Sequence, residues 1–541
     1  MGQTHDEITQ NLAERLCGEV ARRDDARVAR RLYRKPLVDG VYRLDEGALL
    51  DDFFHVLQAL GVMVLREEAH GAAIHRQMVP FVQYGRLYSR KTLVGMERIK
   101  ARPSLLCSDE ALMRWVGFHA QQVRQGLCQR GVTTRQGERL PGPLCPDTLA
   151  KHIVKWHVRD LEAVCKGSIR ALAKAGVFGA KVSGSADGTD LETTEHYPGR
   201  GQVTRTVRSD ETRGRRPEIE VTVYGWHVCL LLDAATKMPL AVNVGQMQAP
   251  EARWTRALVT QARLHRQGDA RLHTVVFDQG LLDGTTLWWL DHQEITCVVP
   301  AKTHMAVTAD ARAQAAADEE LTGGRRVHTV RQGQGKTART ERLETAGVGL
   351  TGLTTSDQYG TPAHGRQQPR RDFQPHPINA VVVRTWRGKD SGPGGNTVFL
   401  THASVAKPLQ PVDDDDDRSL SDNCGIKEAK PPWELGPPPQ KTDRAVRVPV
   451  MCTRLMCALA TAYRLACERE ARGEEPVGWQ RWRRQRLEQT RDQVIVFAQG
   501  DYGRFHLAEY SLLLGVQLTD VPPEVGSRQQ VLAKHRLPAR D

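Results

Sequence analysis

IEVTVYGWHVCLLLDAATKMPLAVNVG spans residues 219–245 and holds two β-rich, almost entirely apolar runs. A polar break from Asp233 to Lys237 separates them. Runs that are apolar on both faces are typical of strands buried within a sheet, and a short polar break is typical of the turn between paired strands. The stretch therefore predicts a hairpin of two buried strands.

Helical and strand patterns alternate after this hairpin. The patterns predict a helix at APEARWTRALVTQARLH (249–265), a short strand at LHTVVFD (272–278), a second helix at LLDGTTLWWLDH (281–292) and a further strand at ITCVVPAK (295–302). Strands that alternate with helices are typical of an α/β layer. The region from residue 178 to 300 is therefore predicted to form an α/β core.

The regions on either side of this core differ from it in residue pattern and composition. Apolar residues at three-to-four spacing predict a mainly helical region over 1–177. Residues 301–403 are polar, with apolar islands, and predict a β-rich insertion with long loops. An acidic, proline-rich segment and then a buried helix occupy residues 404–475, and a basic, helical C-terminal region is expected over 476–541.

The composition favours a globular protein with a polyanionic partner. The chain has 541 residues and a net charge of +12, which suggests two to four domains and makes nucleic acid the leading partner, ahead of membrane. A merely basic enzyme has the same composition. Basic helices are predicted at 27–35 and 478–491, and each can dock on phosphates, but a solvated or packed helix face explains each of them as well.

Several signals are expected to be absent. The first twenty residues carry four acids and no apolar core, which argues against a secretory signal. No apolar run is expected to reach the roughly 18 residues that cross a bilayer. The eleven cysteines include no CxxC pair, which argues against a zinc ribbon, and their odd number favours a reducing compartment. A cytoplasmic protein without a membrane partner is expected.

Two acidic residues stand beside predicted strands. Asp187 directly follows a predicted strand in SADGTDL (185–191), and Asp278 ends another in VVFDQG (275–280). A carboxylate at a strand end of an α/β sheet points into the crevice where ligands bind. Aspartate is also common where strands turn, so position alone leaves a structural role open for either residue.

Other polar residues near these motifs are expected to have structural roles. Turn or cap roles suffice for Asp190, Asp233 and Asp283. His227 lies within a strand pattern and is expected to be packed rather than catalytic.

Together these motifs resemble the DDE transposases of bacterial insertion sequences, in the cut-and-paste group with an RNase H-like core and a β-rich insertion. The resemblance is carried by SADGTDL, by the hairpin, by VVFDQGLLDG and by RSLSDNCGIKEAKPPWELG (418–436). It implies an RNase H-like core formed by 178–300 and 404–475 and interrupted by the insertion at 301–403. It also implies that the helical N-terminal region binds DNA ends.

The resemblance places the third acidic motif in PVDDDDDRSLSD (411–422). The family's motif has Tyr, Arg and Glu at steps of three and four residues. Arg418 matches the Arg, whereas Asp415 and Asp422 stand at the Tyr and Glu positions. On a helix these three residues share one face, and Glu428 faces away from it by about 120°. Asp422 is therefore the expected third acid, and the remaining aspartates of the run are expected to be solvated.

The resemblance implies that Asp187, Asp278 and Asp422 hold two Mg²⁺ or Mn²⁺ ions. Two ions about 3.5–4 Å apart activate the attacking oxygen and stabilise the leaving oxygen. Water first cuts at the element's end, and the freed 3′-hydroxyl then attacks target DNA. Arg418 is implied to contact a phosphate. Aspartate at position 422 keeps a hard oxygen ligand but is one methylene shorter than glutamate, which costs on the order of 10²-fold in rate if the ion is misplaced.

Three further residues are implied to contact DNA. Lys427 and Lys430 lie near the position of the family's lysine, although neither has its usual spacing. Trp386 lies on the insertion, where an aromatic residue of related transposases stacks on a flipped base, worth about 1–3 kcal/mol; core packing is the competing role. The implied partner is double-stranded DNA, both terminal inverted repeats and target, bound by a dimer at the bacterial nucleoid.

Two other functions remain open. An RNase H-like nuclease would cut DNA and never join it. A transposase-derived DNA-binding protein would have lost catalysis, and the altered third motif favours this alternative.

Overall fold

The computed structural model divides into two compact units: Met1–Ala171 with Lys430–Gln440 and Arg444–Asp541, and Leu172–Ala429 with Lys441–Asp443. The structure describes residues 22–43, 47–61, 81–93, 107, 109–118, 123–124, 132–133, 137, 139–140, 144–153, 156–208, 218–265, 271–303, 305–317, 326–332, 339–350, 378–386, 397–407, 410–421, 443–470 and 479–538. The second unit carries both acids that the sequence places beside strands.

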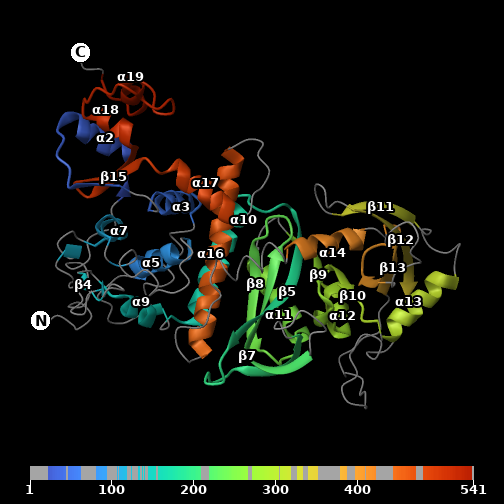
Figure 1. Ribbon diagram of the computed structural model, residues 1–541. Coiled ribbons are helices and arrows are strands. Elements are labelled where there is room, and N and C mark those ends of the chain that lie inside the picture. The colour runs from blue at the N-terminus through green and yellow to red at the C-terminus, as the bar shows by residue number, and fades with distance from the viewer. Residues whose placement is uncertain are drawn as a thin grey trace, which may run out of the picture. The chain divides into compact units, whose positions relative to one another are not determined.

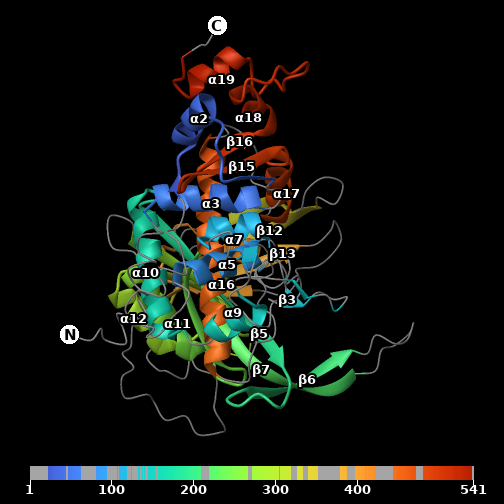
Figure 2. The ribbon, with the colours of Figure 1, turned by 90° about the vertical axis from the view of Figure 1, so that its left-hand side faces the viewer.

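A mixed sheet, with ten strands among the described residues, is the framework of the second unit (Figure 1). Its order is β11-β12-β13-β14-β10-β9-β5-β7-β6, and β8 pairs with β7. The strands are β5 (Lys181–Thr193), β6 (Gly201–Arg208), β7 (Glu218–Asp233), β8 (Pro239–Gln246), β9 (Arg271–Phe277), β10 (Thr296–Pro300), β11 (Arg326–Gln332), β12 (Arg339–Leu350), β13 (Ile378–Trp386) and β14 (Thr397–Thr401). β6 and the first half of β7 extend from the sheet as a two-stranded ribbon (Figure 2).

The predicted hairpin is confirmed as β7 and β8, which pair antiparallel. Leu230, Leu231 and Leu232 are buried, as the apolar run requires. The turn is fixed by the Asp233 carboxylate, which accepts hydrogen bonds from the backbone N–H and the hydroxyl of Thr236 at 3.0 and 2.6 Å. Asp233 therefore has the predicted turn role.

The predicted alternation of helices and strands is also confirmed. Helix α11 (Ala252–His265) precedes β9, and α12 (Gly284–His292) lies between β9 and β10. β9 pairs parallel with both β5 and β10. Asp283 caps α12, as expected, by accepting a hydrogen bond from the N–H of Thr286 at 3.1 Å. The unit is therefore a mixed α/β structure.

The predicted β-rich insertion extends the same sheet. After helix α13 (Ala306–Ala317), strands β11 to β14 form an antiparallel run, and β14 joins it to β10 with Val298 opposite Thr401. The apolar islands of this segment therefore become buried sheet strands, in which Val381, Val382 and Leu400 are buried. Helices α13 and α14 contact these strands.

The acidic segment forms helix α14 (Gln410–Ser421), which packs on β5, β9, β10 and β14. Val412, in its first turn, belongs to an apolar cluster with residues of four strands: Val276, Val298, Val381, Val383 and Phe399. Asp413 lies in the first turn, where a negative charge interacts favourably with the helix dipole. The expected acidic helix is present.

The first unit is mainly helical in its middle part. Its helices there are α3 (Gly47–Ala59), α5 (Phe81–Leu93), α7 (Glu110–Val116), α9 (Pro146–Ile153), α10 (Val158–Lys174), α16 (Asp443–Glu470) and α17 (Trp479–Gln489), with a small strand pair β3 (Val132–Thr133) and β4 (Arg139–Leu140). The basic helix predicted near 478–491 is α17, and its Trp482 is buried against Tyr463 with ring centroids 5.1 Å apart. Packing therefore accounts for this tryptophan.

One helix of this unit corrects the expectation that no apolar run is long enough to cross a membrane. The stretch Val446–Cys467 of α16 is long and apolar enough, with a mean hydropathy of 1.2, and 67% of it is buried. Such burial is typical of the core helix of a globular protein. Length and composition alone are weak evidence for a membrane span.

The two ends of the chain build one small sheet, which the prediction of mainly helical terminal regions did not include. Its order is β1-β16-β15-β2, and helices α2, α18 and α19 accompany it. The elements are β1 (Arg22–Arg23), α2 (Asp25–Arg34), β2 (Gly40–Arg43), β15 (Gln493–Ala498), β16 (Asp501–His506), α18 (Leu507–Leu513) and α19 (Arg528–Lys534). Val28 and Leu32 share a buried core with Val496 and Phe505, which explains why segments so distant in sequence combine.

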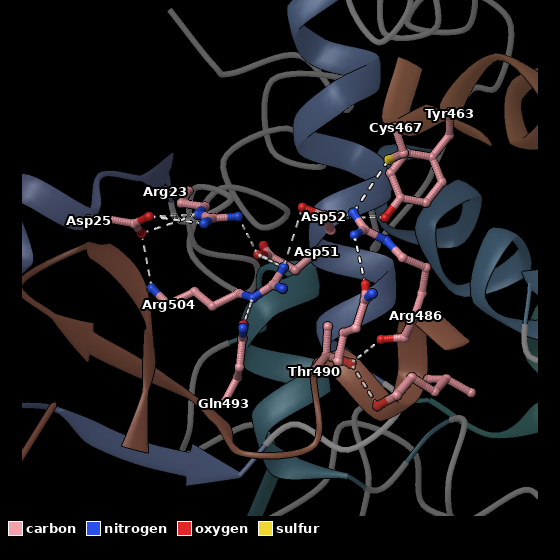
Figure 3. Close-up of polar contacts among 12 residues, drawn as sticks. Arg23, Asp25, Asp51, Asp52, Tyr463, Cys467, Arg486, Thr490, Gln493 and Arg504 are labelled. Carbon is pink, nitrogen blue, oxygen red and sulfur yellow. Dashed lines mark hydrogen bonds and ion pairs between the residues drawn. The ribbon is translucent and has the colours of Figure 1, made fainter. Parts of the chain in front are cut away.

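A buried polar network lies in the first unit (Figure 3). The Asp51 carboxylate is 1% exposed and accepts hydrogen bonds from Arg23 and from the Trp115 indole, at 2.9 and 3.3 Å, and from the Tyr502 hydroxyl. Asp52 accepts from Arg486 at 2.8 Å. Buried carboxylates require such partners, because an unpaired buried charge destabilises the folded state strongly.

Candidate functional site

Asp187 and Asp278 lie at the same level on neighbouring parallel strands. The pairing of β5 with β9 ends with Ala186 opposite Phe277, and each acid is the next residue along the chain. Asp278 follows the last residue of β9, as predicted. The predicted strand end before Asp187 is wrong, because β5 pairs with β7 and continues to Thr193.

Both acids lie on the face of the sheet that α14 covers. Successive side chains of a strand point to opposite faces, so Asp187 shares its face with Ser185. Ser185 pairs with Val276, and Val276 packs against Val412 of α14. Asp278 is two residues beyond Val276 in extended backbone and belongs to the same face. The pairing of β5 with β9 therefore brings the motifs of Asp187 and Asp278 together, on the face that α14 covers.

The remaining predicted site residues are only partly described. Helix α14 ends at Ser421, and Asp422, Lys427 and Lys430 lie outside the described residues. Arg418 lies on α14 and Trp386 ends β13, but their side chains are not among those that the structure describes. The roles assigned to these five residues stay predictions.

The two strand-borne carboxylates suit a hard divalent cation. Both aspartates are half-buried. Oδ1 of Asp187 accepts a hydrogen bond from the N–H of Gly188 at 2.6 Å, and the Asp278 side chain does not cap the short 3₁₀ helix η1 (Gln279–Leu281) that follows it. Carboxylate oxygens are the ligands that Mg²⁺ and Mn²⁺ prefer. Within the described ranges, no three His, Cys, Asp or Glu side chains form a ready metal-binding group.

A chain of polar contacts, missed by the sequence analysis, begins at Asp190, whose side chain points to the opposite face of β5 from that of Asp187. His227 on β7 stands opposite Asp190 on β5, and its Nδ1 is 2.6 Å from Oδ1 of Asp190. Its Nε2 is 3.2 Å from Oε1 of Glu251, directly before α11. Arg205 forms an ion pair with Asp190. The expected turn or cap role of Asp190 is therefore wrong, whereas His227 is buried as predicted, stacked on Trp254 at 5.3 Å.

The electrostatics of this polar chain follow from burial. Burial lowers the pKa of His227, and Arg205 lowers it further, while the negative charges of Glu251 and Asp187 oppose the shift. Burial also raises the pKa of the neighbouring Cys229 thiol well above its usual range, and the same two carboxylates add to the rise. Cys229 is therefore a protonated core residue and not a nucleophile.

Glu251 borders the same space as Asp278. A Cβ atom added at Gly280 would stand 2.3 Å from Oε2 of Glu251 and 3.8 Å from Oδ2 of Asp278. The two carboxylates thus approach one spot from the start of α11 and the end of β9. The only sequence signal for Glu251 is an acid at the start of a helix that follows the hairpin, which an ordinary helix-end preference explains equally well.

Comparison with known proteins yields a weak structural neighbour. No family model matches the sequence, and no curated protein matches it. Among solved structures, a cryo-EM structure of a piggyBac transposase synaptic complex with hairpin DNA superposes with a TM-score of 0.35 and 10% sequence identity, over 86% of this chain and 80% of that chain. A likeness at this level establishes no shared activity, so the function proposed next rests on the acids and their placement.

Proposed function

We propose that this chain is a DNA transposase of the DDE type, which cleaves DNA at transposon ends and joins the freed 3′-hydroxyl to target DNA. The observation that carries the proposal is the placement of Asp187 and Asp278 on adjacent parallel strands, on the face covered by α14. Helix α14 leads directly into Asp422. The same placement supports an RNase H-like core, in which strand-borne acids meet an acid from a later helix.

The proposed chemistry needs three carboxylates at one place. Asp187, Asp278 and Asp422 would hold two Mg²⁺ or Mn²⁺ ions, which supply an activated water and charge stabilisation for in-line displacement at phosphorus. Arg418 would bind a phosphate oxygen as a charge-assisted donor. Lys427 and Lys430 would add phosphate contacts, and the net charge of +12 favours association with DNA generally.

The proposed partners follow from the reaction. Cut-and-paste transfer requires two ends to be held together, so a dimer on two terminal inverted repeats is proposed, at the bacterial nucleoid. Trp386 is the last residue of β13, opposite Arg342 of β12. Stacking of its ring on an unpaired base at the DNA end is its proposed role.

The test is Mn²⁺-dependent cleavage of DNA that carries the inverted repeats flanking the gene. Asp187→Ala and Asp422→Asn are expected to reduce cleavage by at least ~10²-fold, because each removes a ligand that positions the ions. Glu428→Gln is the matched control, with the same loss of one negative charge six residues away, and should leave cleavage unchanged. Cleavage that survives Asp187→Ala overturns the proposed site.

Joining separates the transposase from the alternatives. A transposase transfers the cut 3′ end into a supercoiled plasmid, whereas a nuclease yields cut ends alone. A DNA-binding protein without catalysis would shift the inverted repeats in a gel and leave them intact with any divalent ion.

A further inference from the structure

Glu251 has a defined position in the structure, and the reaction proposed above gives it no role. It directly precedes α11, and its backbone carbonyl accepts the N–H of Trp254 at 2.9 Å. Its side chain is 33% exposed, so solvent reaches it. One carboxylate oxygen approaches His227, and the other borders the space beside Asp278.

His227 is held so that it faces Glu251. Its side chain is 9% exposed, its Nδ1 contacts Asp190, and its ring stacks on Trp254 with an interplanar angle of 20°. Its Nε2 is buried and makes no aligned hydrogen bond, yet lies 3.2 Å from Oε1 of Glu251. A histidine fixed on two sides presents its remaining nitrogen in one direction, here toward the carboxylate.

Two glycines keep this arrangement open. A Cβ atom at Gly188 would stand 2.1 Å from Nε2 of His227, and one at Gly280 would stand 2.3 Å from Oε2 of Glu251. Real Cβ atoms do not approach other atoms so closely, so any side chain at either position would displace the imidazole or the carboxylate. The backbone on both sides is thus shaped around the His227–Glu251 pair.

We propose that Glu251 is an additional acidic residue of the Asp187–Asp278 site, where its Oε2 accepts hydrogen bonds from the hydration water of a divalent cation. His227, Asp190 and Trp254 are its positioning residues. This inference rests on the proposed metal-dependent function and adds to it a water-mediated contact from the start of α11.

A water-mediated role fits the geometry better than direct ligation. Glu251 does not join Asp187 and Asp278 in a ready ligand group among the residues that the structure describes. Mg²⁺ keeps several of its waters when protein carboxylates bind it, and those waters need acceptors. Acceptors behind the direct ligands contribute about 10–100-fold to metal affinity.

The test is Mn²⁺ affinity of the full chain without DNA, measured from the electron paramagnetic resonance signal of free Mn²⁺. Glu251→Gln is expected to weaken binding about 10–100-fold. The control is Glu220→Gln, which removes one negative charge from an exposed position of β7, seven residues before His227. This variant should change the Mn²⁺ affinity less than twofold. His227→Gln should also weaken Mn²⁺ binding. The variant that carries both His227→Gln and Glu251→Gln should bind Mn²⁺ no more weakly than Glu251→Gln alone.

The outcomes separate this inference from the proposed function. If Asp278→Asn abolishes Mn²⁺ binding while Glu251→Gln binds within twofold of the natural protein, Glu251 has only a structural role and the inference is overturned, but the proposed function stands. If the natural protein does not bind Mn²⁺, both the inference and the proposed function are overturned. Should Glu251→Gln fail to fold, Glu251→Asp keeps the charge and withdraws it by one methylene, and unchanged Mn²⁺ affinity in that variant overturns the inference.

Discussion

Asp187 and Asp278 have the same side chain, but their backbone environments differ. Asp187 sits inside a strand that pairs on both sides up to this point, whereas Asp278 ends its strand and starts a 3₁₀ turn. The sheet therefore fixes the direction of the Asp187 carboxylate, and the turn fixes that of Asp278. Both directions are set by backbone hydrogen bonds, so conservative replacements at these positions test chemistry more than folding.

Lys91 gives a prediction of stability that depends on pH. It is 7% exposed on α5, and burial lowers its pKa from 10.5 to about 8, although Cys452 opposes the shift. Below pH 8 the folded state holds a charged, buried ammonium, which costs about 3 kcal/mol relative to the unfolded chain. Lys91→Met is therefore expected to stabilise the protein by about that amount at pH 7.

The pH profile distinguishes this cause from better packing. The folded pKa lies below the unfolded one, so the folded state binds fewer protons between pH 8 and 10.5 and the natural protein gains stability as the pH rises through that window. The free-energy difference between Lys91→Met and the natural protein, from denaturant unfolding, should shrink from pH 8 upward. Lys151→Met, exposed on α9, is the matched control and should show no such trend. A difference that stays constant with pH would refute the titration argument.

At the scale of single elements, α14 connects the sheet to the proposed third acid. Val412→Ala removes two methyl groups from its contact with the sheet and is expected to lower stability by about 2 kcal/mol. The loosened helix should misplace the third acidic motif and lower cleavage by up to ~10²-fold. Cleavage rates and unfolding midpoints measured together check this expectation.

The matched control for that change lies in the other unit. Val496→Ala makes the same substitution at a fully buried position of β15. It should cost similar stability and leave cleavage unchanged. Equal loss of cleavage in both variants would show that general destabilisation, and not the position of α14, limits the activity.

At the scale of the whole molecule, the two ends of the chain depend on each other. β1 pairs with β16, β2 pairs with β15, and α2 packs into the same core. Truncation after Thr490 removes the partners of all three N-terminal elements. Backbone amides of residues 24–43 are then expected to lose their protection from hydrogen exchange, while those of β9 keep theirs. Truncation after Pro538 is the control, and persistent protection in the shorter chain would contradict this dependence.

Elements whose pattern is local could be predicted from the amino-acid sequence. The hairpin of β7 and β8, the alternation from α11 to β10, the acidic helix α14 and the long helix α16 follow from apolar periodicity and turn residues. Asp278 was located by the same reasoning, because the end of a short apolar strand is visible in the chain. Periodicity suffices where one stretch contains both the apolar face and the signals that end it.

Features that depend on pairing between distant segments could be seen only in the folded chain. The continuation of β5 through Asp187, the sheet formed by the two chain ends, and the contact of Asp190 with His227 and Glu251 each join segments whose separation in sequence leaves no local signal. A polar residue such as Asp190 has the same local pattern whether it ends a turn or faces a histidine. Strand register makes that choice, because a shift by one residue moves every side chain to the opposite face.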